Sequence, residues 1–233
     1  MRSRAFTILL FLTTVAAAPV TPSDAVQSIL ARMDKAASKF KNMTARATYV
    51  THTDVINEDS PETATVVMQK VGAGEVRGLI NFLEPDKHTV SIENRRVRIY
   101  YPKMNTVQEF DLGKHGEQLD QFLMIGFGTS GTALAKGYDV SVLGTETVKG
   151  FEGIQTIRLQ LIPKTGEARQ YVTKLELWIP ESGDPYPLQE KISEPSRDYR
   201  RITYAGIKTN QPLPPDALQL KPARGFKTEY PGK

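Results

Sequence analysis

The stretch HTVSIENRRVRIYY, residues 88–101, decides the fold class because it holds two short alternating segments around a turn. In its second half Val97, Ile99 and Tyr101 fall on one face, and arginines fall on the other. Between the halves, Asn94-Arg95 is typical of a tight turn, since asparagine tolerates a left-handed backbone. We therefore predict an antiparallel hairpin with one strand on each side of this pair.

The same period of two continues on both sides of this hairpin, and it is cleanest at Ile157, Leu159 and Leu161. With the hairpin, the pattern predicts about eleven strands. The other nine lie at 43–49, 64–69, 76–83, 106–112, 138–148, 156–161, 171–179, 188–193 and 198–207. Short linkers between successive strands favour antiparallel neighbours, and no linker divides the chain.

Helical spacing occurs in only a few places. Residues 22–40 carry an amphipathic stripe preceded by a capping threonine, which predicts one N-terminal helix. Between 113 and 137 the strand pattern stops, and Leu119, Phe122 and Leu123 have the spacing of a short helix. The predicted fold class is α+β, mainly β: a single, strongly curved antiparallel sheet with helices on one face.

The N-terminus is typical of a secretory signal peptide. Arg2 and Arg4 precede the apolar run at 5–18, which is shorter than the roughly 20 residues that span a membrane. Cleavage after Ala17 fits best, with cleavage after Ala18 or an uncleaved anchor as alternatives. We expect a signal peptide at 1–17, a single domain at 18–233, and export to the periplasm.

The residue types exclude several classes of function. The 233 residues include no cysteine, which excludes a disulfide scaffold, a thiol nucleophile and a cysteine zinc site. The three histidines, His52, His88 and His115, lack metal-ligand spacing. Loss of Arg2 and Arg4 would lower the net charge from +4 to about +2, which gives no support for nucleic-acid binding. We expect no metal or cofactor.

No catalytic motif emerges. Residues 126–131 match G-x-G-x-x-G, but a dinucleotide site needs a strand, a crossover helix and a parallel strand around that motif. Acidic residues cluster at 54–62, but their spacing alone does not define a catalytic pair, and we interpret them as a solvated loop. We therefore expect a protein that is not an enzyme.

Two surfaces are candidates for binding. Arginines at a hairpin favour either a solvated edge or docking to an acidic partner or anionic lipid; they are Arg95, Arg96 and Arg98. Medium-sized apolar residues point to the inside of the curved sheet, where they form either a packed core or the wall of an apolar cavity. These residues are Tyr49, Met68, Ile80, Phe82, Ile99, Ile157, Leu159 and Leu177.

The order of elements and three short stretches resemble the LolA family of periplasmic lipoprotein carriers and lipoprotein-sorting proteins. ENRRVRIYYPKMNTV at 93–107 is similar to the family's turn, basic residue, aromatic strand and tyrosine-x-proline. NFLEPDK at 81–87 and PPDAL at 214–218 resemble two further segments. The resemblance extends from about residue 24 to residue 226.

The resemblance implies an unclosed β-barrel with a helical lid over an apolar cavity for acyl chains. It assigns the lid to Leu119, Phe122, Leu123 and Phe127, and the lid hinge to Gly126, Gly128 and Gly131. One departure concerns gating. Family members often carry an arginine before the proline of the second segment, where it holds the lid closed, and Glu84 stands there in this chain.

Two functions remain as hypotheses. The first is a monomeric carrier that binds lipid-modified proteins or other lipids and transfers them toward the outer membrane. By the resemblance, its partners are an inner-membrane lipoprotein-releasing transporter and an outer-membrane acceptor. The second is an envelope sensor or interaction module of the same fold that regulates a stress response.

Overall fold

The computed structural model describes residues 22–72, 75–113 and 125–231. Within them lie the helices α1 (Pro22–Lys39), α3 (Gly131–Gly137) and α4 (Gly166–Arg169) and the 3-10 helix η1 (Asp54–Ile56). The first six strands are β1 (Asn42–Thr53), β2 (Glu58–Val71), β3 (Glu75–Glu84), β4 (His88–Glu93), β5 (Arg96–Tyr101) and β6 (Thr106–Asp111). The others are β7 (Tyr138–Thr147), β8 (Gln155–Pro163), β9 (Lys174–Pro180), β10 (Gln189–Ser193), β11 (Tyr199–Thr209) and β12 (Lys227–Glu229).

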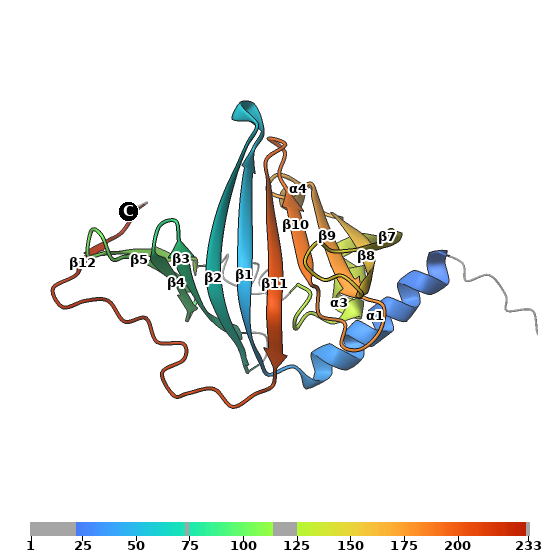
Figure 1. Ribbon diagram of the computed structural model, residues 1–233, viewed down its shortest axis with the longest axis horizontal. Helices are drawn as coiled ribbons and strands as arrows, with labels where there is room; N and C mark the ends of the chain where they lie inside the picture. The colour runs from blue at the N-terminus through green and yellow to red at the C-terminus, as the bar shows by residue number, and fades with distance from the viewer. Residues whose placement is uncertain (1–21, 73–74, 114–124, 232–233) are drawn as a thin grey trace, which may run out of the picture.

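These strands form one unclosed sheet of twelve, in the order β12-β6-β5-β4-β3-β2-β1-β11-β10-β9-β8-β7. The chain builds β1 to β6 outward to one edge, then starts again at the opposite edge with β7 and returns until β11 pairs with β1. Figure 1 shows β3–β6 and β7–β10 as two wings on either side of the long central strands β1, β2 and β11. The predicted curved antiparallel sheet with an N-terminal helix is confirmed.

Alternation along the strands gives the sheet an inner face and an outer face. We define the inner face as the one that carries Ala47, Ile80 and Leu159. Helix α1 lies against this face because its apolar stripe, with Ile29 and Met33, packs onto the leucines of β8 and β9. Burial of that stripe fixes the helix along the β7–β10 wing (Figure 1).

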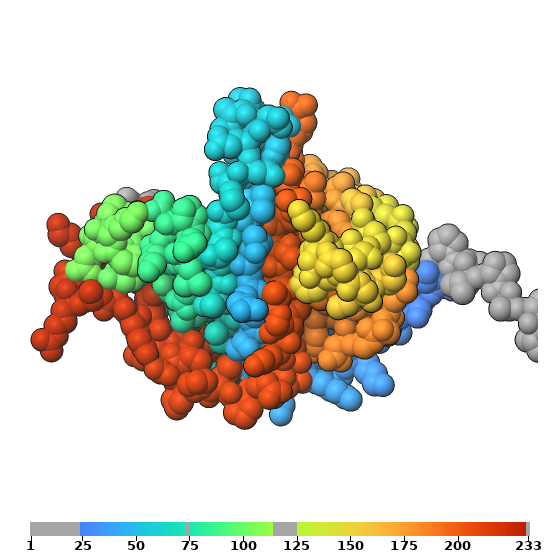
Figure 2. Space-filling view, viewed as in Figure 1, coloured from blue at the N-terminus to red at the C-terminus, as the bar shows by residue number. Residues whose placement is uncertain are grey.

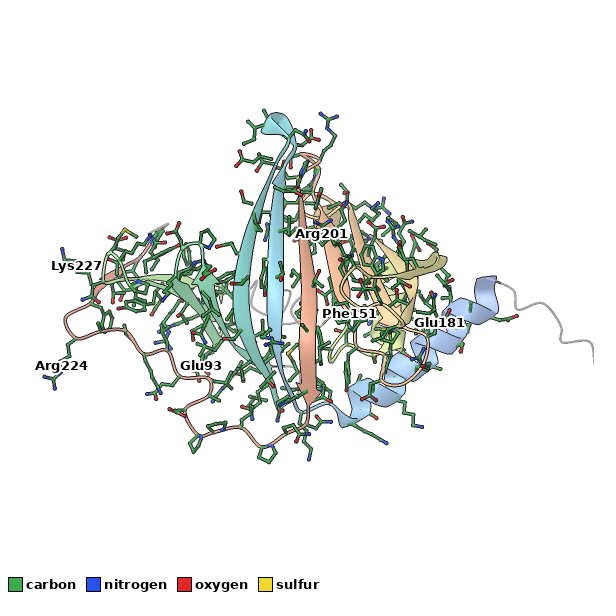
Figure 3. All side chains as sticks on the ribbon, in the orientation of Figure 1. Glu93, Phe151, Glu181, Arg201, Arg224 and Lys227 are labelled. Atoms are coloured by element: carbon green, nitrogen blue, oxygen red, sulfur yellow. The ribbon has the colours of Figure 1, made fainter. Side chains whose placement is uncertain are left out.

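The C-terminal tail contacts the outer face of the β3–β6 wing at β5 and at the turn after it. The Ala223 N–H donates to the Tyr100 hydroxyl oxygen at 3.1 Å, and the Asn105 side-chain amide donates to the Arg224 carbonyl at 3.2 Å. Figure 3 labels Arg224 and Lys227 in this tail. The tail ends in β12, which pairs parallel with β6. The sequence pattern favours a short strand or turn at 217–221; a turn forms at 215–218, and the strand forms only at Lys227–Glu229.

A second difference concerns the predicted strand at 171–179. The strand β9 starts only at Lys174, because α4 and the turn after it occupy the preceding residues. The Thr165 side chain accepts a hydrogen bond from the Ala168 N–H and so caps this short helix. The sequence pattern also favours a turn of helix at 133–135, and α3 forms there.

The predicted signal peptide at 1–17 and the predicted short helix around Leu119 lie outside the described residues. Among the helices of the described part, none combines the length and apolar character that a membrane span needs.

Candidate functional site

The structure places all eight predicted lining residues on the inner face. On one wing, Ile80 lies opposite Val90, which lies opposite Ile99. On the other wing, Leu159 lies opposite Leu177. The cross-strand pairs thus confirm the direction of these side chains, while their contact with acyl chains stays a prediction.

The β7–β10 wing is filled on its inner face. Leu159 and Leu177 are 0% exposed and belong to a cluster with Leu30 of α1 and Leu134 of α3. Ile157 is partly buried against the same cluster. Because two helices already occupy this side, Leu159 and Leu177 act as core residues, and we call β7–β10 the filled wing.

The β3–β6 wing is different, and we call it the open wing. Val76 and Ile92 are buried on this face, but its other inner side chains on β3, β4 and β5 are apolar or aromatic and only partly buried. They are Ile80, Phe82, His88, Val90, Val97, Ile99 and Tyr101. A partly exposed apolar surface of this kind is typical of a ligand-binding face.

Aromatic rings form a continuous row across the inner face of this wing. The rings of Tyr49 and Phe82 are 5.0 Å apart, and Phe82 stacks on His88 at 4.2 Å. His88 in turn stacks on Tyr101 at 5.9 Å. Burial, followed by the charges of Glu190 and Glu62, raises the pKa of the Tyr49 hydroxyl, so this end of the row stays neutral.

A short segment lies between the two wings. Phe127 stacks on Tyr186 at 5.9 Å and meets the edge of Tyr204 at 4.9 Å. Gly126 has φ +85, and a Cβ there would lie 2.6 Å from the Cγ of Pro187. Only glycine fits, because the backbone is left-handed and the space is closed. The predicted lid residue Phe127 is therefore packed against the sheet.

The other predicted lid and hinge residues are only partly described. Leu119, Phe122 and Leu123 lie outside the described residues. Gly131 starts α3, and a Cβ there would lie 2.1 Å from the Leu30 carbonyl oxygen, so its small size lets α3 approach α1. Gly128 is partly buried between these positions. A hinge role for the three glycines stays a prediction.

Sequence reasoning missed the buried carboxyl of Glu190 on β10. It lies on the inner face opposite Ile202 of β11 and Leu177 of β9, where the filled wing joins the central strands. The Tyr204 hydroxyl donates to its Oε2 at 3.4 Å, and burial raises the pKa of Glu190 to about 8. The sequence did hold a signal for this burial, because Glu190 lies two residues from Ile192 and alternation places both on the inner face of β10.

The predicted docking patch lies on the outer face and carries ion pairs. Arg96 lies 3.4 Å from Glu109, and Arg98 lies 3.7 Å from Glu93. Arg95 sits in the turn with φ +59. The carboxylates offset part of the positive charge, and a docking role stays a prediction.

A further hollow of about 530 Å³ lies where α4 and its turn approach the connection between β10 and β11. Tyr171, Val172 and Ile192 line its apolar part. Its charged lining residues neutralise each other, since Arg200 lies 2.7 Å from Glu194. It borders the filled wing and is separate from the aromatic row.

Comparisons with known proteins give the fold. No family model matches the sequence, and no curated protein matches it. An uncharacterized conserved protein from Thermus thermophilus matches with a TM-score of 0.52 and 15% identity, over 88% of this chain and 99% of its own. MucB matches with a TM-score of 0.50 and 18% identity, over 84% of this chain.

The chain spans 63% of MucB, which is less than two thirds of that protein. A LolA superfamily protein from Nitrosomonas europaea is also matched, with a TM-score of 0.39 and 13% identity, over 84% of this chain and 97% of its own. Identities this low show the fold alone. The unclosed, curved sheet and the N-terminal helix agree with the fold that the resemblance implies, and the chain shares this fold with the Thermus thermophilus protein and with MucB.

Proposed function

We propose that the chain is a periplasmic carrier without catalytic activity that binds acyl chains of lipoproteins, or of other lipids, and moves them toward the outer membrane. The observation that carries the proposal is the inner face of the open wing. There a row of stacked rings continues into aliphatic side chains that the rest of the described chain leaves partly exposed. The donor would be an inner-membrane transporter and the acceptor an outer-membrane protein.

The energetics favour a surface of this kind. Moving an acyl chain from a membrane into water costs about 0.8 kcal/mol for each methylene. A carrier must therefore bury most of the chain, and aromatic and aliphatic side chains such as Phe82 and Ile99 supply the contact. Because these residues are not needed to fill a core, the ligand can leave without unfolding the protein.

Binding of a fluorescent acyl probe tests this proposal. In Ile99→Asp, a charge enters the inner face of the open wing, and the affinity is expected to fall about tenfold or more. The matched control is Leu143→Asp, which places the same charge at a β7 residue that is already 48% exposed. Equal affinities for the two variants, or no probe binding by the native protein, would contradict the proposal.

An envelope sensor is the second candidate, favoured by the likeness to MucB, which has been crystallised in complex with MucA(peri). In that case lipid binding at the same face would change how the chain binds a protein partner. An affinity purification from envelope extracts separates the two functions. Recovery of a lipid-modified protein supports the carrier, and recovery of a regulatory protein alone supports the sensor.

A further inference from the structure

The β1–β2 hairpin and the neighbouring connection between β10 and β11 project together beyond the rest of the molecule, as Figure 2 shows at the top of the view. Its tip is the short helix η1, where Val55 is 89% exposed and Ile56 is 65% exposed. Two neighbouring aliphatic side chains held so far from the core gain nothing from packing in the protein itself. Such a tip is typical of a surface that meets a partner.

The tip is braced by the connection between β10 and β11. The Asp54 N–H donates to the Asp198 carboxylate at 2.8 Å, and the Asp54 carboxylate lies 2.8 Å from Arg197. Below them His52 stacks on Tyr199 at 4.6 Å. These contacts hold η1 in a defined position, so the exposed side chains are presented rather than left on a free loop.

A third exposed side chain, an aromatic one, lies near the same connection. Tyr171 is 72% exposed, and its neighbour Thr173 donates its N–H to Ser193, the last residue of β10. Tyrosine is favoured at the boundary between lipid and water because it joins an apolar ring to a polar hydroxyl. This end of the molecule therefore combines a protruding aliphatic tip with an interfacial aromatic residue.

Shape and charge indicate the partner. A narrow convex tip would need a matching groove on a protein partner. A lipid bilayer needs no such groove, because its headgroups can move apart around the tip. The side chains around η1 are mainly acidic: Asp54, Glu58 and Asp59 lie on the hairpin, and Asp198 lies beside it. Arg197 lies 2.8 Å from Asp54 and His52 lies 2.7 Å from Asp59. This excess of negative charge disfavours anionic lipid headgroups.

We infer that the η1 tip docks the protein on a bilayer of zwitterionic phospholipid by inserting Val55 and Ile56 between the headgroups. The docking itself does not depend on the proposed function, but its purpose rests on it, since a carrier must approach a membrane to load or deliver lipid. Insertion of two aliphatic side chains gives weak, reversible binding, which suits a protein that must leave again.

Tryptophan fluorescence tests the insertion. The chain has one tryptophan, Trp178, which is 6% exposed, so a second one in Val55→Trp reports the tip. With phosphatidylcholine vesicles, the added emission is expected to shift to the blue and to be quenched by brominated lipid. The control Met104→Trp, at a residue 61% exposed in another turn, is expected to show neither change. An unchanged Val55→Trp spectrum would overturn the inference.

Vesicle flotation gives the second readout. The double variant Val55→Ser/Ile56→Ser is expected to lose about tenfold or more of the binding to phosphatidylcholine vesicles, and added phosphatidylglycerol should not strengthen binding of the native protein. The same variant should bind the acyl probe normally, whereas Ile99→Asp should float normally and lose the probe. If the native protein does not float and the tip instead crosslinks to a protein, the tip is a protein-docking site and the inference fails.

Discussion

The two wings of the sheet have the same alternation of apolar side chains on the inner face, but they differ in how deeply those side chains are buried. In the filled wing, Leu159 and Leu177 are 0% exposed beneath α1 and α3. In the open wing, Ile80 and Ile99 occupy equivalent inner positions and are only partly buried. Alternation thus decides which face a side chain joins, and a separate element decides whether that face becomes a core or a binding surface.

The largest expected effect is a loss of stability when a charge is placed in the filled wing. Leu159→Asp places a charge in a fully buried cluster, so it is expected to lower the free energy of unfolding by about 4 kcal/mol or more. The matching change in the open wing, Ile99→Asp, should cost about 1 kcal/mol because its side chain already reaches solvent. Urea unfolding followed by circular dichroism measures both. Similar losses for the two variants would mean that the wings do not differ.

The next effect concerns Glu190, where the filled wing joins the central strands. Because burial raises the pKa of Glu190 to about 8, the folded state holds a proton that the unfolded state releases near its usual value of 4.5. Stability should therefore fall as the pH rises from about 4.5 to about 8, by an upper limit of about 5 kcal/mol. Tyr204 and Tyr49 face this carboxyl with raised pKa values and remain neutral in this range.

Glu190→Gln keeps the shape of the side chain and cannot ionise, so it should remove most of this pH dependence and be more stable than the native protein at about pH 9. Thermal unfolding at about pH 6 and about pH 9 measures the difference. The same slope with pH in both proteins would show that Glu190 is not the group responsible.

The smallest effect sharpens the account of the open wing. Phe82→Leu keeps an apolar side chain but removes the ring that stacks between Tyr49 and His88. Acyl-probe affinity is expected to fall about twofold to fivefold, with little change in stability. Phe151→Leu, at a partly buried ring in another cluster, is the control. An equal fall in the control would remove the aromatic row from the binding surface.

Much of the fold could be predicted because alternating apolar and polar residues in each segment show both that it is a strand and which side chains share a face. The hairpin at 88–101 has the predicted strand bounds, and Ile157, Leu159 and Leu161 share one face as expected. β12 was missed because its three residues are all exposed, so they show no alternation of apolar and polar side chains. This strand is defined by its pairing with β6, which lies far away in the sequence. α4 was missed because four residues are too few for helical spacing to appear.

The site was harder to predict than the fold. A strand pattern is the same for a core leucine and for a wall leucine, so Leu159 and Ile99 entered one predicted cavity. The distinction depends on where α1 and α3 pack, which is a long-range property. Glu190 drew no prediction, since its burial depends on Tyr204 of β11 and on the segment at Gly126, both of which lie against its carboxyl.

The most direct test of the contrast between the wings is photo-crosslinking with a fatty acid that carries a diazirine on its chain, followed by mass spectrometry of the labelled peptides. The account predicts label on the inner side chains of the open wing, at Phe82, Ile99 and their neighbours on β3–β5, and its loss when unlabelled fatty acid competes. Label concentrated on β8 and β9, or label that competitor does not displace, would contradict it.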